Sequence, residues 1–449
     1  MGARQHWSNR FMFILAAAGS AIGLGNLWKF PYITGINGGG AFVLLYLLCI
    51  AIVGLPILIA EMYIGQQSQV NAVSAFEKMH QPRSMWRVAG FAGLLSAVLI
   101  LSFYAVVGGW VFDFLYRSVL FEFQSMSEAG VESTLSTLFS SPLRQVIWFT
   151  LFMLLTAGIT AGGIKNGLEK WNRILMPSLF VILVALFVYA LFLPGFAEAF
   201  TFLFRPDFSK LNASSILEAM GHSFFTLSLG MGCILTYGSF LDKKESLPRI
   251  ALTIAGLDTV IALMAGVVIF SIVFSYGLEA SSGPGLMFAT LPVLFQKIPM
   301  GNYVSILFFL LVSFAALTSA VSMLEVVVAY LEEKRKWLHK KAVVVSASMI
   351  YLLGFLSLFS TNIMSDFKIF GKTFFDLFDL LTSSYLLPFG GLIISLFLGW
   401  KLSYEAAEKI LGKGHGYLAK GLVFTTRFLA PAGVLAVLVN KIVETLSNA

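Results

Sequence analysis

The first apolar segment of the sequence, at 11–35, carries the glycine-rich stretch Gly19-Ser20-Ala21-Ile22-Gly23-Leu24-Gly25-Asn26. A segment of this length can cross a bilayer as a helix. Each glycine inside a helix costs about 1 kcal/mol relative to alanine, so the helix is weakest here. A break would free backbone amides and carbonyls that lipid cannot satisfy, and these groups would have to face protein, water, an ion or a ligand. The alternative is that the glycines serve close packing between helices.

The composition of the chain requires a membrane protein. Of its 449 residues, 58% are hydrophobic and 12% are charged, whereas about 25% of the residues of a soluble domain are charged. The net charge of +7 does not indicate nucleic-acid binding, because the basic residues fall in short loops. The two cysteines and five scattered histidines predict neither a disulfide framework nor a transition-metal site. No cleavable signal peptide is expected, because the first apolar run is too long.

Eleven apolar segments are predicted to span the membrane. They cover 11–35, 41–66, 88–121, 143–162, 167–193, 214–240, 247–276, 302–331, 340–360, 374–400 and 421–446. Most of the 30 Lys and Arg residues fall in segments that are cytoplasmic if the N-terminus is inside, and this asymmetry sets orientation. We therefore expect a multi-pass protein of the cell membrane with a cytoplasmic N-terminus and an extracellular C-terminus.

A second interruption lies in the sixth segment, at Phe224-Phe225-Thr226-Leu227-Ser228-Leu229-Gly230-Met231-Gly232. The two interrupted segments are five apart, and paired broken segments at corresponding positions indicate an inverted-repeat transporter with its site at the breaks. We expect a first repeat at 1–193, a second at 194–413 and an additional helix at 414–449. The alternative is that glycines, which are frequent in membrane helices, are paired here by chance.

The eighth segment carries small and hydroxyl residues at 315, 318, 319, 322 and 323, which share one helical face. Such a face can pack helices through hydroxyl groups. Hydroxyl and carbonyl oxygens are also the ligands that hard cations prefer. Opposite a broken helix, this face could complete a dehydrated sodium site.

Ionisable residues inside the apolar segments need an explanation, because burying a charge is costly. Asp258 in the seventh segment is expected to bind a cation, or else to be a protonated or hydrogen-bonded structural acid. Glu61 in the second segment is expected to cap freed backbone amides. His222 precedes the second interruption, and we interpret it as a packed or pore-facing side chain rather than a catalytic base.

Four charged residues near the segment ends are candidate gates. Lys29 and Asp379 could pair on the outer side, and Arg4 and Glu333 on the inner side. Surface ion pairs contribute a median of about 0–1 kcal/mol, and a gate that must open needs a weak contact. The alternative is that these charges are unrelated.

Several stretches together closely resemble the neurotransmitter:sodium symporter family. They are Trp7 to Pro31 with its Gly-Leu-Gly-Asn-Leu-Trp-Lys-Phe-Pro run, Asn37-Gly-Gly-Gly-Ala-Phe, the Gly54-Leu-Pro to Glu61 stretch, Phe225-Thr-Leu-Ser-Leu-Gly and Ala316-Leu-Thr-Ser. The similarity extends over about the first 400 residues and is closest to short prokaryotic members. It implies an all-α integral membrane protein of 11 transmembrane helices with the LeuT-type fold, a 5+5 inverted repeat whose helices 1 and 6 are discontinuous.

The resemblance implies two sodium sites. The first would use the carbonyls of Ala21 and Thr226 and the side chains of Asn26, Thr226 and Asp258, completed by the carboxylate of the substrate. The family often has Asn where this chain has Asp258, which adds a negative charge. The second site would use the carbonyls of Gly19, Ile22 and Ala315 with the hydroxyls of Thr318 and Ser319.

The resemblance also implies a substrate pocket. Its carboxylate end would be formed by Ala21, Gly23, Gly25, Tyr104 and Thr226, its outer cover by Phe225, and its side-chain subsite by Ile100, Ser228, Met231, Ser319, Ser322 and Met323. The family's amine transporters place an aspartate where this chain has Gly23, so a monoamine without a carboxylate is not expected.

From the residues and the resemblance together, we expect a symporter that couples sodium to neutral hydrophobic or aromatic L-amino acids by alternating access. Its expected partners are the amino acid and the lipid bilayer, with no nucleic acid and no obligate protein partner. An ion channel is the first rival; saturable flux of an amino acid would exclude it. A membrane enzyme is the second, and it would need a nucleophile–base pair or metal cluster that the apolar segments do not offer.

Overall fold

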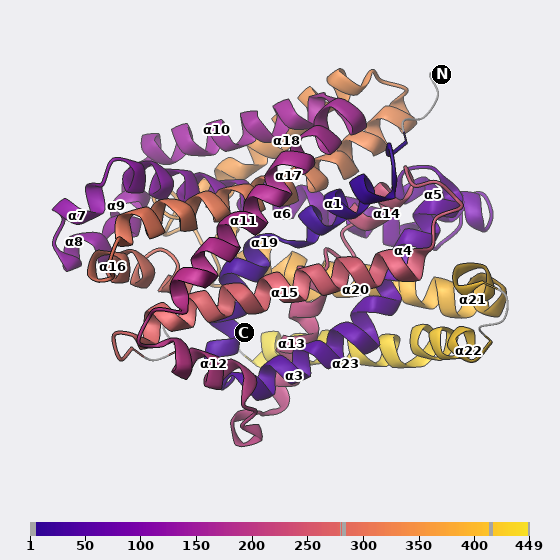
Figure 1. Ribbon diagram of the computed structural model, residues 1–449. Coiled ribbons are helices and arrows are strands. Elements are labelled where there is room, and N and C mark those ends of the chain that lie inside the picture. Colours follow the sequence, from indigo (N-terminus) through magenta and orange to yellow (C-terminus); the bar gives the residue numbers. More distant parts are fainter. Residues whose placement is uncertain (1–5, 279, 281–283, 413–415, 448–449) are drawn as a thin grey trace.

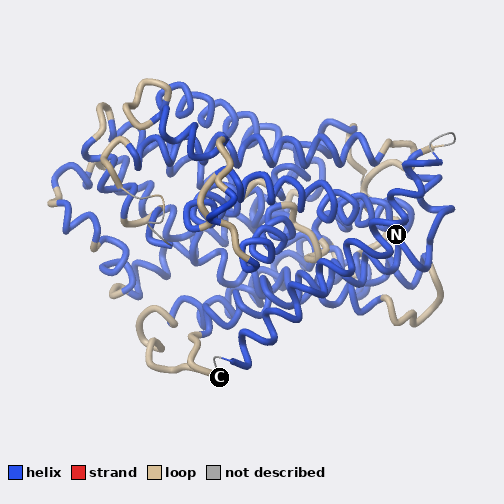
Figure 2. Tube along the Cα trace, turned by 90° about the horizontal axis from the view of Figure 1, so that it is seen from below, coloured by secondary structure: helices blue, strands red, loops and turns tan. Residues whose placement is uncertain are grey.

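The computed structural model describes residues 6–278, 280, 284–412 and 416–447. Within these residues the protein forms helices and turns and no strand, apart from an isolated bridge between Ile369 and Lys372. The long helices run side by side in one bundle (Figure 1). Viewed from below, the bundle is almost wholly helical and has loops at both of its ends (Figure 2).

The bounds of the helices follow the predicted segments closely. Those up to residue 204 are α1 (Arg10–Ala21), η1 (Gly25–Lys29), α2 (Phe30–Ile36), α3 (Gly40–Cys49), η2 (Ile50–Gly54), α4 (Leu55–Ser68), α5 (Ala72–Met79), α6 (Arg87–Val119), α7 (Glu122–Ser125), α8 (Glu128–Glu132), α9 (Thr134–Phe139), α10 (Pro142–Ala161), η3 (Ile164–Glu169), α11 (Lys170–Ala190) and α12 (Phe196–Phe204). Those that follow are η4 (Phe208–Lys210), α13 (Ala213–Thr226), α14 (Cys233–Gly238), α15 (Leu247–Phe274), η5 (Pro284–Leu286), α16 (Thr290–Lys297), α17 (Gly301–Arg335), α18 (His339–Phe359), α19 (Phe374–Asp379), η6 (Leu380–Leu386), α20 (Leu387–Leu396), η7 (Phe397–Leu402), α21 (Ser403–Leu411), α22 (Gly416–Phe424), η8 (Thr425–Leu429) and α23 (Ala430–Ser447).

Nine of the described helices are long and apolar enough to cross a membrane, and the bent pair formed by 10–21 and 25–36 would make a tenth. These ten correspond to every predicted segment except the sixth. The sixth segment forms α13 and α14, of 14 and 6 residues, because the interruption between them removes six residues from the helix. The protein is therefore an all-helical, multi-pass membrane protein, as predicted.

The first break separates α1 from η1 and α2. Asn9 caps the start of α1, where its side chain accepts a hydrogen bond from the amide of Met12 at 3.0 Å. The helix ends at Ala21, Ile22 is extended, and the two halves are bent by 49°. The break predicted from the glycine-rich stretch is thus present, and it opens the backbone in the middle of the bundle.

The second break joins α13 to α14 through residues with positive φ. Ser228, Gly230 and Gly232 have φ of 54°, 77° and 76°, a region that residues other than glycine rarely adopt. A side chain at Gly230 would also collide with α20, because its Cβ would lie 2.2 Å from the carbonyl oxygen of Leu387. Glu61 Oε1 accepts a hydrogen bond from the Gly230 amide at 2.7 Å. The predicted capping role of Glu61 is therefore confirmed.

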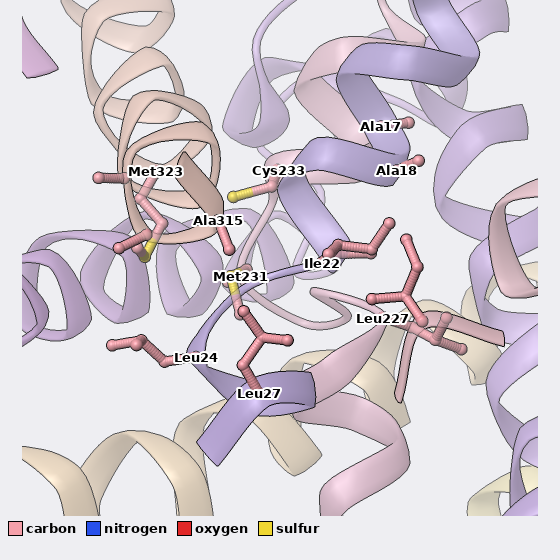
Figure 3. Close-up of a cluster of buried hydrophobic side chains, with 14 of the residues drawn as sticks. Ala17, Ala18, Ile22, Leu24, Leu27, Leu227, Met231, Cys233, Ala315 and Met323 are labelled. Atoms are coloured by element: carbon pink, nitrogen blue, oxygen red, sulfur yellow. The ribbon is translucent and has the colours of Figure 1, made fainter. Parts of the chain in front are cut away.

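The two breaks meet in the interior of the bundle. The first half of the broken pair, α1, packs against α11, α14, α15 and α17. Around it, Ala17, Ala18, Ile22, Leu227 and Ala315 form part of a buried apolar cluster (Figure 3). Small side chains let membrane helices approach closely, so this packing holds the open backbone of both breaks against one face of α17.

Candidate functional site

A cavity lies where the two breaks face α17, and its empty volume is about 320 Å³. Its lining residues are Ser20, Ala21, Gly23, Leu24, Gly25, Ile100, Tyr104, Phe225, Ser228, Met231, Ser319 and Met323. Leu24, Met231 and Met323 approach it from the first break, the second break and α17 (Figure 3). All the predicted substrate-binding residues line this cavity except Thr226 and Ser322.

The two exceptions lie behind the wall of the cavity. Thr226 contacts Asp258, and the Ser322 hydroxyl accepts a hydrogen bond from Ser20 Oγ at 2.8 Å. Ser20 and Leu24 line the cavity but are not among the residues predicted to bind the substrate. Both belong to the glycine-rich stretch, so the predicted break in the helix could have indicated that they line the site.

Glycines keep one end of the cavity open to the backbone. A Cβ on Gly23 would lie 2.6 Å from Ser319 Oγ and 3.0 Å from the Tyr104 hydroxyl. A Cβ on Gly25 would lie 3.1 Å from the ring of Phe225. The Tyr104 hydroxyl also accepts a weak hydrogen bond from the Leu24 amide at 3.4 Å. This end therefore presents backbone amides and one hydroxyl, and it has no room for a larger residue at Gly23.

A buried carboxylate lies behind this end of the cavity. Asp258 is 0% exposed, and its Oδ1 accepts hydrogen bonds from Asn26 Nδ2 at 2.7 Å and Thr226 Oγ1 at 3.0 Å. The Tyr46 hydroxyl donates to Oδ2 at 3.3 Å. None of the ion pairs among the described residues includes Asp258. A carboxylate buried among neutral donors is suited to a cation, since an unpaired buried charge is costly.

A second group of oxygens surrounds Ser319. Its Oγ lies 3.3 Å from the carbonyl oxygen of Gly19, 3.1 Å from that of Ser20 and 3.4 Å from that of Ile22. The Ser20 carbonyl also accepts a hydrogen bond from Ser228 Oγ at 2.8 Å. Ser319 has a single hydrogen to donate, so it cannot fully satisfy both of the other two carbonyls. Next to it, Thr318 Oγ1 lies 3.0 Å from the carbonyl oxygen of Ala315. The site is rich in acceptors and poor in donors, which favours a hard cation.

A second cavity, with an empty volume of about 720 Å³, lies next to the first one. It is lined by Leu24, Trp28, Lys29, Tyr32, Phe103, Tyr104, Val107, Phe225, Phe375 and Asp379. Leu24, Tyr104 and Phe225 line both cavities and therefore form the partition between them. Phe225 thus lies between the two cavities, and its role as an outer cover of the substrate stays a prediction.

The predicted outer pair is not formed in this structure. Lys29 Nζ lies over the ring of Phe225, 4.6 Å from its centroid, a cation–π contact. Asp379 Oδ1 accepts a hydrogen bond from Ser383 at 2.8 Å. Both charged residues line the outer cavity, but no ion pair joins them.

On the inner side, Arg4 lies outside the described residues, so the predicted pair with Glu333 is not described. Glu333 Oε2 accepts hydrogen bonds from the amide and the side chain of Asn71, at 2.8 and 2.7 Å. Glu169 also contacts the residues just before α1, because it accepts hydrogen bonds from the amide and hydroxyl of Ser8, at 2.5 and 2.7 Å. No pattern in the sequence indicates the Ser8–Glu169 contact, because the two residues come from different segments.

His222 is a buried histidine near the site, and neither of its ring nitrogens has a hydrogen-bond partner among the described residues. His222 is 2% exposed and lies between aromatic rings, 5.9 Å from Phe30 and 5.3 Å from Tyr46 between centroids. Its position agrees with the interpretation as a packed histidine. Among the described residues, no group of three His, Cys, Asp or Glu side chains is placed to hold a metal ion.

Comparisons with known proteins give matches over almost the whole chain. The model of the sodium:neurotransmitter symporter family matches residues 4–129 and 134–449. An uncharacterized sodium-dependent transporter of Bacillus subtilis, YhdH, is 38% identical over 441 residues, which cover 97% of each chain. A sodium-dependent transporter of Haemophilus influenzae is 33% identical over 449 residues, covering 98% of each. The crystal structure of MhsT in complex with L-phenylalanine is similar with a TM-score of 0.90 and 44% identity, covering 98% of this chain and 100% of that one.

Proposed function

The chain belongs to the sodium:neurotransmitter symporter family and is a sodium-dependent transporter rather than an enzyme, and we propose that it couples sodium to the uptake of neutral hydrophobic or aromatic L-amino acids. The observation that carries the proposal is the position of Ser319. This residue lines the central cavity and also lies among the carbonyl oxygens of the first break. A substrate and a cation would therefore bind side by side.

We assign two sodium ions to the two oxygen groups. One would bind at Asp258 with Asn26 and Thr226, next to the carbonyl of Ala21. The other would bind between α1 and α17, to the carbonyls of Gly19, Ile22 and Ala315 and the hydroxyls of Thr318 and Ser319. The support is the buried carboxylate without a cationic partner in the first group, and the excess of acceptors over donors in the second.

The proposed substrate follows from the two ends of the cavity. The glycine backbone and the Tyr104 hydroxyl at one end suit a carboxylate, since backbone amides and hydroxyls donate to anions. The other end is lined by Ile100, Met231 and Met323, which suit an apolar side chain. MhsT, whose structure holds L-phenylalanine, is 44% identical to this chain, and this similarity adds support. A carboxylate next to Asn26 and Thr226 would also contact the first sodium, which would couple the two ligands.

Alternating access would move the two repeats, 1–193 and 194–413, about the central site, with 414–449 as an additional helix. We propose that the N-terminus is cytoplasmic. The inner side would be closed by the Ser8–Glu169 contact together with Arg4 and Glu333, and the outer side by Lys29 and Asp379. Since Lys29 and Asp379 line the same outer cavity, a closing movement of the two walls would bring them together.

The outer gate predicts a specific pattern of charge reversals. Lys29→Asp and Asp379→Lys should each reduce uptake, and the double variant should retain more uptake than either single variant because the pair is restored. Asp376→Lys is a matched control: Asp376 lies in the same helix, α19, and is exposed, so it should not rescue Lys29→Asp. A double variant whose loss equals the sum of the single losses would mean that Lys29 and Asp379 do not interact.

Two methionines in the side-chain subsite predict broad selectivity. Methionine is unbranched and flexible, and it makes favourable contacts with aromatic rings, so leucine, phenylalanine, tyrosine and tryptophan should all bind, and glycine and charged amino acids poorly. Met231→Phe fills the subsite and should weaken tryptophan more than leucine, by about tenfold or more, because a methylene-sized change in a pocket is worth about 1–3 kcal/mol. Competition binding measures the ratio of the affinities for tryptophan and leucine. Met349→Phe, at an exposed position of α18, is the control.

If Met231→Phe lowers the affinities for tryptophan and leucine equally, Met231 does not determine specificity. A wild-type protein that binds only one of the four amino acids would contradict the broad subsite as a whole.

Uptake into proteoliposomes tests the proposed function. Purified protein should accumulate radiolabelled L-phenylalanine when an inward sodium gradient is applied, and not when choline replaces sodium. A panel of unlabelled amino acids should compete in the order that the subsite predicts. Sodium flux that neither requires nor saturates with an amino acid would instead indicate a channel and would contradict the proposal.

A further inference from the structure

Asn172 has a buried carboxamide oxygen that accepts no hydrogen bond among the described residues. The residue lies in α11 and is 3% exposed, and its Nδ2 donates a hydrogen bond to the carbonyl of Leu168 at 2.9 Å. Its Oδ1 has no hydrogen-bond partner in the part of the chain that the structure describes. Native proteins leave few buried polar atoms unsatisfied, and a bound ion can satisfy such an atom where protein groups do not.

The orientation of this carboxamide is fixed by its neighbour. The carbonyl of Leu168 is an acceptor, so it must face the NH₂ group and not the oxygen of Asn172. The oxygen therefore points the other way, toward α1. A Cβ placed on Gly19 would lie 2.6 Å from Asn172 Oδ1 and 3.2 Å from the Cβ of Thr318.

These distances place the unpaired oxygen beside the proposed second sodium site. The carbonyl of Gly19 and the hydroxyl of Thr318 both belong to that site, and α11 packs against both α1 and α17. The absence of a side chain at Gly19 is what allows Asn172 to approach. Asn172 follows η3 (Ile164–Glu169), whose Glu169 holds Ser8 at the inner end of α1, so the oxygen reaches the site from the inner side.

We propose that Asn172 supplies a further oxygen ligand to the second sodium site and holds the ion on the side that leads to the inner end of the bundle. The proposal rests on the proposed function, because it concerns the same sodium ion. A carboxamide oxygen is a neutral ligand of the same kind as the backbone carbonyls that replace the hydration shell of cations in channels. The competing role for Asn172 is only to cap the carbonyl of Leu168.

Two replacements of similar size separate these two roles. Asn172→Leu removes both the oxygen and the amide donor, and Asn172→Asp keeps an oxygen, adds negative charge and removes the donor. The sodium concentration that gives half-maximal thermal stabilisation is measured on purified protein in mildly alkaline buffer, with choline keeping the ionic strength constant. Asn166→Leu and Asn166→Asp are matched controls, because Asn166 lies in η3 and is exposed.

We expect Asn172→Leu to raise this sodium concentration by about 10–100-fold, as loss of a ligand or its support typically does. Asn172→Asp should lower it, and both Asn166 variants should behave like the wild type. If Asn172→Leu does not fold, Asn172→Asp alone tests the proposal, because a carboxylate at this position attracts the ion only if the side-chain oxygen faces the sodium site. An unchanged or raised sodium requirement in Asn172→Asp overturns the role of Asn172.

The outcomes also separate this inference from the proposed function. A wild-type protein that sodium does not stabilise would overturn both. A wild-type protein that sodium stabilises, with a response that Thr318→Ala/Ser319→Ala removes and the Asn172 variants leave unchanged, would overturn only the role of Asn172.

Discussion

Replacing Thr318 and Ser319 together by alanine should raise the sodium concentration for half-maximal L-phenylalanine binding by about 100-fold or more, since loss of a single contributor to a metal site typically costs about 10–100-fold in affinity. Both hydroxyls lie on the face of α17 toward the first break, and Ser319 Oγ is within 3.4 Å of three carbonyl oxygens. The double variant removes two of the proposed oxygen ligands, and of the three carbonyls the one of Ser20 keeps a hydrogen bond from Ser228 Oγ at 2.8 Å.

The fold should survive this change. Thr318 Oγ1 otherwise contacts only carbonyls of its own helix, those of Phe314 and Ala315, and the helix does not depend on such contacts. Ser313→Ala is the matched control, because this buried hydroxyl of α17 contacts only the carbonyl of Phe309 at 2.7 Å. Binding is measured by scintillation proximity over a range of sodium concentrations. Unchanged sodium dependence in the double variant would mean that the ion does not bind between α1 and α17.

Gly23→Ala should abolish high-affinity substrate binding. The added Cβ would lie 2.6 Å from Ser319 Oγ and 3.0 Å from the Tyr104 hydroxyl, and overpacking of this kind typically costs about 1–3 kcal/mol. Gly23 lies between the proposed carboxylate subsite and the Ser319 oxygen group, so both ligands are affected at once. We expect amino-acid affinity to fall on the order of 100-fold, since each 1.4 kcal/mol corresponds to about tenfold.

Gly158→Ala is the control for this prediction. Gly158 lies in α10, and a Cβ there would have nothing within 4 Å, so the variant should bind like the wild type. Equilibrium binding of L-phenylalanine and the thermal unfolding midpoint are measured for both variants. Near wild-type affinity in Gly23→Ala would show that the substrate carboxylate does not lie against the first break.

Local features of the sequence predict the architecture well. The two breaks follow from conformational demands that glycine meets at particular positions, such as Gly230, and such demands are visible without a structure. The interruption predicted in the sixth segment, 214–240, is likewise present, and it divides the segment into the two short helices α13 and α14. Its exact extent is harder to predict, because the positive φ of Ser228, 54°, occurs at a residue that rarely adopts this conformation.

The site is harder to predict where it depends on contacts between distant segments. Tyr46 donates to Asp258 from 212 residues away in the sequence, and spacing within either segment does not show that their faces meet. The same holds for the carbonyl of Ser20 near Ser319 and for Asn172 beside Gly19. Lys29 can be placed near the outer end of the pocket, but its contact with Phe225 depends on how the helices are rotated.

The reciprocal effect of sodium and substrate on each other's affinity tests the central claim most directly. If both ligands bind at the breaks and share contacts, saturating sodium must increase the affinity for L-phenylalanine by some factor, and L-phenylalanine must by linkage lower the sodium concentration for half-maximal stabilisation, by a factor that is smaller for each ion because two ions share the coupling. Both factors are measured on the same purified protein, the first by equilibrium binding of the amino acid and the second by sodium titration of thermal stability. The account predicts that both factors are well above one, and L-phenylalanine binding that is the same in sodium and in choline would contradict it.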